Sequence, residues 1–198
     1  MVNPFSTKFW ASGVIPFQFS EPGESIDALL EQTRWHSVCQ IVGPHGSGKS
    51  TLLLELYRQY EASGEKVRYL FFNDQQRHMP NDTMFRESIA VFVDGFEQLP
   101  LFRQLWLRFL SKRLILTVHR PLWFVPVLYR TQPQFSVFVQ LVQQMVANLP
   151  EEPVLRAVYD RSGGNFRDAF FELYDMFSMK DSFVREGTSQ DGYAPAGT

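Results

Sequence analysis

The residues best suited to chemistry form the segment Gly43-Pro44-His45-Gly46-Ser47-Gly48-Lys49-Ser50, which matches the phosphate-loop pattern G-x4-G-K-[ST] in full. Glycines at these positions let backbone N–H groups turn inward around phosphate oxygens, and a following helix adds its dipole. We expect Lys49 to reach the β- and γ-phosphates and Ser50 to ligate Mg²⁺. Thr51 completes the expected nucleotide contacts. The segment predicts binding of a nucleoside triphosphate, with Mg·ATP as the expected ligand.

A carboxylate follows the apolar run at residues 89–93, as in the Walker B strands of nucleotide-binding sheets. Asp94 would hold Mg²⁺ directly or through water, whereas the plainer interpretation is an Asp that caps the turn Asp94-Gly95. Glu97 is the nearest further carboxylate. It either polarises an attacking water or is a solvated or helix-capping side chain, and the sequence favours neither.

Two more segments carry candidate site residues. The apolar run 114–118 ends in polar groups, of which His119 is the first candidate and Thr117 the second for sensing a γ-phosphate. Gly163 and Gly164 can stop one helix, and Asn165 can cap the next. Arg167 then falls in a first helical turn, where the dipole disfavours a cation. This placement suggests an anionic partner, or else a solvated arginine.

The elements that must position these residues alternate along the chain. Apolar runs predict strands at 38–42, 67–72, 89–93 and 114–118, and helical patterns cover 50–62 and 101–113. Residues 136–139 are read as a fifth strand, or 137–146 as one helix. The repeat predicts an α/β fold with three α/β/α layers and a mainly parallel sheet of about five strands. We expect this core at 1–140, a small helical lid at 141–183 and a disordered tail at 184–198.

Bulk composition narrows the class of protein. The chain of 198 residues has 44% hydrophobic residues, enough for a core without disulfides, and its single cysteine excludes both an intrachain disulfide and a cysteine metal cluster. The formal net charge of −2 gives no support for nucleic-acid binding. The N-terminus lacks the pattern of a signal peptide, and no segment has the length of a membrane span. The expected location is the cytoplasm.

Together these motifs resemble the AAA+ superfamily of P-loop ATPases over roughly residues 15–178, in the order lead-in, Walker A, Walker B, sensor 1, lid and sensor 2. The resemblance implies that His119 is sensor 1, that Arg167 is a sensor 2 touching the γ-phosphate, and that Ile15, Phe17 and Phe19 lie near adenine. The chain is also similar to the compact ATPases of the signal-transduction branch.

The sequence departs from that family in two ways. Gly95 stands where many of these ATPases place a catalytic Glu. No arginine finger can be placed, and the candidates are Arg113, Arg120 and Arg130.

Three functions remain open. The first is an AAA+-like ATPase or ATP-dependent switch that binds ATP and ADP and meets a protein partner, or a second copy, through its nucleotide face. The others are a binding module with little hydrolysis, which Gly95 favours, and a small phosphotransferase. The acid-free helix 101–113 reads better as an amphipathic helix than as a nucleic-acid face. The aromatic segment 121–126 is either core or a docking site.

Overall fold

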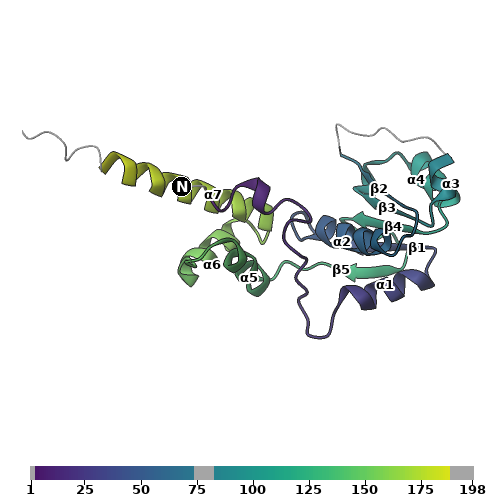
Figure 1. Ribbon diagram of the computed structural model, residues 1–198, viewed down its shortest axis with the longest axis horizontal. Helices are drawn as coiled ribbons and strands as arrows, with labels where there is room; N and C mark the ends of the chain where they lie inside the picture. The colour runs from purple at the N-terminus through teal and green to yellow at the C-terminus, as the bar shows by residue number, and fades with distance from the viewer. Residues whose placement is uncertain (1–2, 74–82, 188–198) are drawn as a thin grey trace, which may run out of the picture.

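We describe the chain from a computed structural model, which covers residues 3–73 and 83–187 (Figure 1). The strands are β1 (Val38–Val42), β2 (Val67–Phe71), β3 (Ala90–Asp94), β4 (Leu114–Val118) and β5 (Val127–Arg130). The α-helices are α1 (Ile26–Trp35), α2 (Lys49–Ala62), α3 (Thr83–Glu87), α4 (Leu101–Leu110), α5 (Phe135–Met145), α6 (Glu152–Arg161) and α7 (Phe166–Gly187). Two 3₁₀ turns, η1 (Thr7–Phe9) and η2 (Phe96–Gln98), complete the elements.

The five strands form one parallel sheet in the order β2-β3-β4-β1-β5. The strands β3, β4 and β1 are therefore neighbours, and their carboxyl ends lie along one edge of the sheet. The predicted polar residues follow these three strands, so the topology gathers them at the edge where open α/β sheets bind ligands. The expected α/β class with a parallel sheet of five strands is confirmed.

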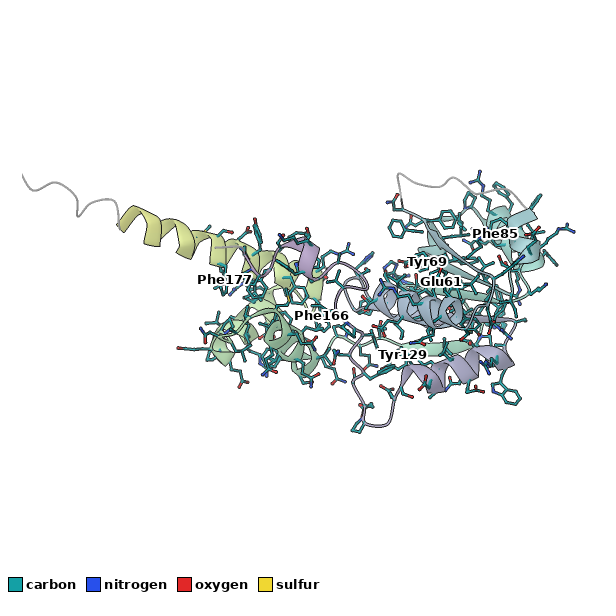
Figure 2. All side chains as sticks on the ribbon, in the orientation of Figure 1. Glu61, Tyr69, Phe85, Tyr129, Phe166 and Phe177 are labelled. Carbon is teal, nitrogen blue, oxygen red and sulfur yellow. The ribbon has the colours of Figure 1, made fainter. Side chains whose placement is uncertain are left out.

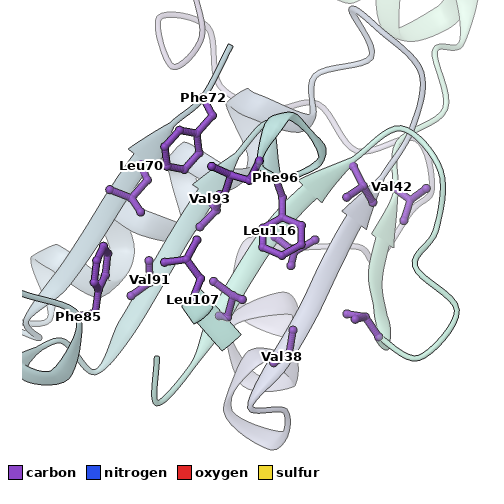
Figure 3. Close-up of a cluster of buried hydrophobic side chains, with 14 residues drawn as sticks. Val38, Val42, Leu70, Phe72, Phe85, Val91, Val93, Phe96, Leu107 and Leu116 are labelled. Atoms are coloured by element: carbon purple, nitrogen blue, oxygen red, sulfur yellow. The ribbon is translucent and has the colours of Figure 1, made fainter. Parts of the chain in front are cut away.

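Alternating side chains of each strand enter two separate cores, which is why the central strands read as continuous apolar runs. On one face Cys39, Ile41 and Phe92 pack under α1 and α2. On the other face Val91, Val93 and Leu116 pack with Phe85 of α3 and Leu107 of α4 (Figure 3). Each fully buried Leu or Phe contributes roughly 1.5–3 kcal/mol relative to exposure. The two cores hold the sheet edge in place beneath the candidate site.

The C-terminal helices have a core of their own. Phe138 of α5, Val158 of α6 and Phe170 of α7 are buried together with Phe5 from the N-terminal segment. In Figure 1 these helices lie beyond the carboxyl ends of the strands, and Figure 2 shows Phe166 and Phe177 among them, away from Tyr69 and Tyr129 around the sheet. The chain therefore places a helical unit next to the edge that carries the predicted site.

Several boundaries differ from the sequence-based expectation. The strand alternative for 136–139 is wrong, because that segment lies in α5 and the fifth strand is β5. Helix α4 ends at Leu110, where Ser111 leaves the helix in an extended conformation. Helix α7 continues to Gly187 because no helix breaker interrupts it, so the expected tail begins inside the helix, and residues 188–198 lie outside the described residues. Among the described helices, none is both long and apolar enough to cross a bilayer.

Candidate functional site

The loop 43–50 connects β1 to α2, as the pattern predicted. Gly46 and Gly48 have φ values of 68° and 89°, in the left-handed region that favours glycine. Gly48 is the N-cap of α2, and no side-chain hydrogen bond caps that helix. A Cβ at Gly46 would overlap the side chain of Asn165, which lies just before α7. The glycines thus serve the turn and also the close approach of the C-terminal helices.

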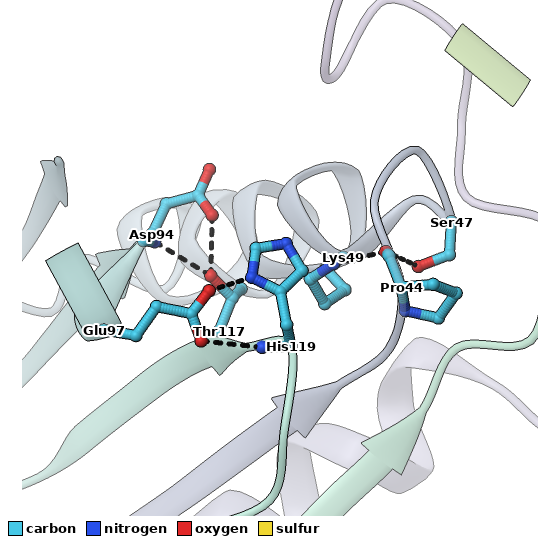
Figure 4. Close-up of polar contacts among 8 residues, drawn as sticks. Pro44, Ser47, Lys49, Asp94, Glu97, Thr117 and His119 are labelled. Carbon is cyan, nitrogen blue, oxygen red and sulfur yellow. Dashed lines mark hydrogen bonds and ion pairs between the residues drawn. The ribbon is translucent and has the colours of Figure 1, made fainter. Parts of the chain in front are cut away.

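Lys49 is the central cation of this loop. Its side chain is only 7% exposed, and Nζ donates a hydrogen bond of 2.5 Å to the carbonyl oxygen of Pro44 (Figure 4). The pKa of Lys49 is lowered to about 8, mainly by burial; the charge of Asp94 opposes this shift and that of Arg167 adds to it. Ser47 closes the loop by donating to the same carbonyl oxygen at 2.8 Å. Burial makes the charged form of Lys49 unfavourable, and an anion bound beside it would stabilise that form.

Asp94 ends β3 and is 6% exposed. Thr117 Oγ1 donates to its Oδ1 at 2.7 Å, and Tyr69 OH donates to its Oδ2 at 3.3 Å. Burial and the neighbouring Asp94 both raise the pKa of Tyr69 far above its usual value. Asp94 is therefore fixed in direction by two hydroxyl groups. Thr117, the second sensor candidate, is itself buried, and its hydroxyl group is hydrogen-bonded to Asp94.

The backbone conformation at residue 95 explains why a glycine, and not a carboxylate, follows Asp94. The φ of Gly95 is 76°, and a Cβ at this position would overlap the carbonyl oxygen of Phe72. Its N–H donates to Thr117 Oγ1 at 3.0 Å. This backbone leaves no room for a side chain, so the position directly after Asp94 cannot supply a carboxylate to the cavity.

Glu97 and His119 bind each other (Figure 4). The backbone N–H of His119 donates to Glu97 Oε2 at 2.9 Å, and Nδ1 of its ring contacts Glu97 Oε1. The ring of His45 stacks on that of His119 with centroids 3.7 Å apart. The pKa of His119 is lowered to about 4, mainly by burial and also by the charges of Lys49 and His45, while Asp94 opposes the shift. His119 is therefore a neutral imidazole at neutral pH, oriented by a carboxylate.

A cavity of about 350 Å³ brings the predicted residues together. Its lining includes every residue predicted to act in catalysis or on the metal: Lys49, Ser50, Asp94, Glu97, His119 and Arg167. In the described part of the chain, neither Lys49 nor Arg167 forms an ion pair with a carboxylate. The cavity is thus lined by two cations, three carboxylates and two imidazoles, since Asp168 and His45 line it as well.

A second cavity of about 520 Å³ lies on the other side of the same loop. The N-terminal segment supplies Trp10, Ile15 and Phe17, while α7 supplies Phe166 and Phe170. This cavity is mainly apolar and aromatic. It shares Gly46 and Arg167 with the first cavity, so the two spaces meet at the loop and at the start of α7.

The N-terminal segment is fastened to α2 beside this cavity. Phe17 N–H donates to Glu55 Oε1 at 2.5 Å, and Arg58 donates to the carbonyl oxygen of Gly13 at 2.8 Å. Burial raises the pKa of Glu55. Phe19 does not line the cavity and instead packs edge-on against Phe17 and Tyr129. Ile15 and Phe17 are therefore placed at the second cavity, and Phe19 supports them from behind.

Other predicted residues lie elsewhere. Arg113 precedes β4, at the opposite end of the strand from His119, and donates to Tyr60 OH and the carbonyl oxygen of Arg34. Arg120 and Arg130 are exposed and line neither cavity. Thr51 lines the apolar cavity rather than the polar one. A Cβ at Gly43 would overlap Thr131, so Gly43 has a packing role.

Three residues at the site were missed from the sequence. Tyr69 reaches Asp94 from the neighbouring strand, Asn165 covers Gly46, and Trp10 lines the apolar cavity. The sequence did contain a signal for Tyr69, because alternate residues of a strand lie on the same side. Along β2 these residues are Val67, Tyr69 and Phe71. No local pattern connects Trp10 or Asn165 with the loop.

Ser50 and Asp94 fit the demands of Mg²⁺. Mg²⁺ is usually held by one or two carboxylates together with substrate phosphates and water, rather than by a cage of protein ligands. Both residues line the polar cavity. Residues 3–73 and 83–187 contain no group of three or more His, Cys, Asp or Glu side chains able to hold a metal ion.

Neither a scan against protein-family models nor a search of curated proteins finds a match for this chain.

Proposed function

We propose that the chain binds Mg·ATP, with the phosphates on the loop 43–50 and the base in the aromatic cavity. One observation carries the proposal: two cavities of opposite chemistry, about 350 Å³ and about 520 Å³, meet at Gly46 and Arg167. A nucleoside triphosphate has the same division, with a charged tail and a flat, largely apolar base. The order of motifs that resembles the AAA+ superfamily supports the same assignment.

Two cations of the polar cavity, Lys49 and Arg167, are placed to bind a polyanion. Lys49 is buried with a pKa lowered to about 8, and Arg167 is near enough to contribute to that shift. Asp94 offsets part of the cost of burying the charge of Lys49, and phosphates bound to Lys49 and Arg167 would offset more of it. Charge-assisted hydrogen bonds to phosphate oxygens would form at the same time.

The proposed reaction is hydrolysis to ADP and phosphate. Ser50 and Asp94 would hold Mg²⁺, which would neutralise charge on the phosphates. A water oxygen forms a bond to the γ-phosphorus as the bridging bond between β-phosphate oxygen and γ-phosphorus breaks, and ADP keeps the electron pair. The water proton passes to His119 Nε2, because Nδ1 faces Glu97.

The state of His119 is coupled to the ligand in this mechanism. Lys49 is one cause of the low pKa of His119. Phosphates that neutralise Lys49 would raise the pKa of His119 and make it a better base, since a base acts best with a pKa near the working pH. Glu97 is then a positioning residue that holds the imidazole, and Gly95 is no obstacle to turnover.

We further propose that the helices α5–α7 act as an AAA+-like lid. Arg167 lies in the first turn of α7 and lines both cavities. A bond from Arg167 to the γ-phosphate would exist with ATP and not with ADP. The position of the lid would then depend on whether ATP or ADP is bound, as it does for the switch segments of other nucleotide-driven proteins.

A second candidate is a nucleotide-binding module with little hydrolysis. It is favoured by the engagement of both Glu97 carboxylate oxygens with His119 and by the low pKa of His119, about 4, in the free protein. Measuring phosphate release over many turnovers separates this candidate from the ATPase.

The test of binding is thermal unfolding with and without Mg·ATP. A ligand that binds only the native state stabilises it by about 2.7 kcal/mol at about 100 times its dissociation constant. Lys49→Ala should lose most of this stabilisation, whereas Lys112→Ala, which changes an exposed lysine, should keep it. Equal stabilisation of both variants would contradict the assignment of the loop.

A further inference from the structure

Helix α4 presents an apolar face to solvent. Five of its side chains are 46–86% exposed: Leu101, Phe102, Leu105, Trp106 and Phe109. Two aromatic residues of the adjoining loop are also exposed, Trp123 at 89% and Phe124 at 64%. Arg108 joins the two groups, since its guanidinium lies 5.0 Å from the ring centroid of Phe124. We call these seven apolar residues the α4 surface.

The α4 surface has the size of a binding site. A Phe or Trp side chain carries roughly 150–250 Å², so the exposed fractions of the seven residues amount to on the order of 800 Å². The largest apolar patch on a typical monomer is roughly 300–600 Å². One side of a standard protein–protein interface is about 800 Å². The patch therefore matches one half of a stable interface.

The exposed aromatics of the loop are held in place rather than loose. Gln40 is fully buried in the middle of β1, and its Nε2 donates to the carbonyl oxygens of Leu122 and Val125 at 2.9 and 2.6 Å. Its Oε1 accepts from Leu122 N–H at 2.9 Å. Leu122 and Val125, on either side of the two exposed aromatics, are thus hydrogen-bonded to β1. Trp123 is therefore exposed on a loop whose backbone is held in place. A preformed surface of this kind loses little entropy on binding.

The stretch of chain that carries this surface has charged side chains of one sign only. The sequence contains no Asp or Glu between Glu97 and Glu151. Arg108, Lys112 and Arg120 are all exposed in this stretch. A second copy of the chain meeting the same surface would bring like charges together. A partner with carboxylates beside its apolar side chains would pair with them.

A lipid bilayer fits less well. Helices that lie on membranes carry their cations on a polar face opposite the apolar one. The face of α4 opposite the exposed residues lies against the sheet, where Leu107 is fully buried. Arg108 stacks on an aromatic ring within the apolar surface itself. A planar guanidinium in that position is suited to a carboxylate held by a protein.

We propose that the α4 surface binds an amphipathic helix of another protein, whose apolar face covers Trp106, Phe109 and Trp123 and whose flanking carboxylates pair with Arg108 and Lys112. The apolar residues supply most of the affinity, and the carboxylates set the orientation.

The α4 surface adjoins, along the chain, the two segments that supply Glu97 and His119 to the polar cavity. Glu97 lies in η2, three residues before Pro100, which is the N-cap of α4. His119 directly follows β4 and begins the loop that carries Trp123. A bound helix would contact both segments that hold the Glu97–His119 pair. This consequence, a change in ATP turnover, rests on the proposed function, whereas the docking itself does not.

The test uses two synthetic helical peptides of equal length. Both carry Leu and Trp on one face; one has Glu at every flanking position, and its twin has Lys. Fluorescence anisotropy should show the Glu peptide binding about tenfold or more tightly than its twin. The paired change Phe109→Ser and Trp123→Ser should weaken binding about tenfold or more. Trp35→Ser, which alters a Trp that is 81% exposed at the end of α1, should leave it unchanged.

Arg108→Glu should reverse the preference between the two peptides while the melting temperature stays constant. Absence of binding by either peptide, or equal binding of both, would overturn the proposal. Two other occupants would also overturn it. One is a second copy, seen as a dimer in sedimentation that Phe109→Ser dissociates. The other is a membrane, seen as flotation with phosphatidylcholine–phosphatidylserine vesicles that the same change abolishes. Altered binding with unaltered ATP turnover would leave the docking intact and remove only the coupling to the site.

Discussion

Helices α2 and α4 cover opposite faces of the same sheet, yet they are used very differently. Leu52, Leu53 and Leu56 of α2 are fully buried, whereas α4, which is richer in apolar residues, fully buries only Leu107. The apolar content of α4 exceeds what the sheet can cover. A hydrophobic helix is therefore not always a buried one, and the excess on α4 forms the exposed surface that we propose binds a partner.

The two helices also deliver different parts of the candidate site. Lys49 is the first residue of α2, and Glu97 lies in the turn that precedes α4. The well-packed helix thus carries the group expected to bind phosphate. Helix α4, which has the exposed face, follows Glu97, the residue expected to orient the imidazole of His119. Binding should depend on the first helix and chemistry on the second.

The largest expected effect concerns packing. Leu56→Ala should lower the free energy of unfolding by about 2–5 kcal/mol, because it removes buried methyl groups and leaves a cavity. Phe109→Ala on α4 should change it by no more than about 0.5 kcal/mol, since that side chain is 86% exposed. Urea unfolding measures both. Similar losses in the two variants would break the comparison between the helices.

The next effect concerns turnover. Glu97→Gln should slow ATP hydrolysis by about 10²-fold or more, the usual scale of acid–base catalysis, because the ring of His119 loses its orienting carboxylate. Affinity for ATP should be retained. Glu61→Gln, on the exposed side of α2, is the control. Unchanged turnover in Glu97→Gln would return Glu97 to a structural role.

A third prediction adds the C-terminal helices to the comparison. Arg167→Ala should weaken ATP binding by about 1.5–3 kcal/mol, the scale of a hydrogen bond to a charged group, and leave ADP affinity nearly unchanged. Calorimetry with both nucleotides measures the difference. Arg161→Ala, in which the lost arginine is paired with Glu172, is the control. Equal losses for ATP and ADP would mean that Arg167 does not contact the γ-phosphate.

The smallest effect concerns pH. The pKa of Lys49 in the free protein is lowered to about 8, and bound phosphates would raise it. ATP affinity should therefore be constant below pH 8 and fall by up to about tenfold per pH unit above it, with uptake of a proton on binding. Lys49→Arg should show no such fall, because guanidinium keeps its charge. A flat profile in the wild-type protein from pH 7 to above pH 9 would contradict this assignment.

The sequence predicted the parts of the fold that carry a local signal. Strands β1 and β4 have the predicted bounds, and α2 begins one residue earlier than expected, because apolar runs and a glycine-rich turn define them. Strand β5 was missed. It is an edge strand that follows Pro126, and Leu128 is its only buried residue, so it has neither a long apolar run nor a clear alternation.

The candidate site was predicted in position but not in its pairings. Sequence analysis placed Asp94 and His119 just after apolar strands and Lys49 just before a helix, which follows from the apolar runs and the glycine-rich segment that precede them. It left Glu97 undecided, because its contact with His119 joins residues 22 positions apart. The same holds for Tyr69 and Asp94, and for Asn165 and Gly46. Such pairs depend on how neighbouring strands and helices lie in space, which a single sequence does not encode locally.

The backbone at Gly95 has a consequence for how this site can vary over evolution. Because no Cβ fits beside the carbonyl oxygen of Phe72, replacing Gly95 by Glu cannot restore the usual arrangement without moving β2 or β3. The carboxylate is therefore expected to stay two residues further along, after the buried Phe96. A relative that shares this site should carry the signature Asp-Gly-apolar-Glu, with a histidine at the end of the next strand. A search that requires Asp-Glu at the Walker B position would pass over it.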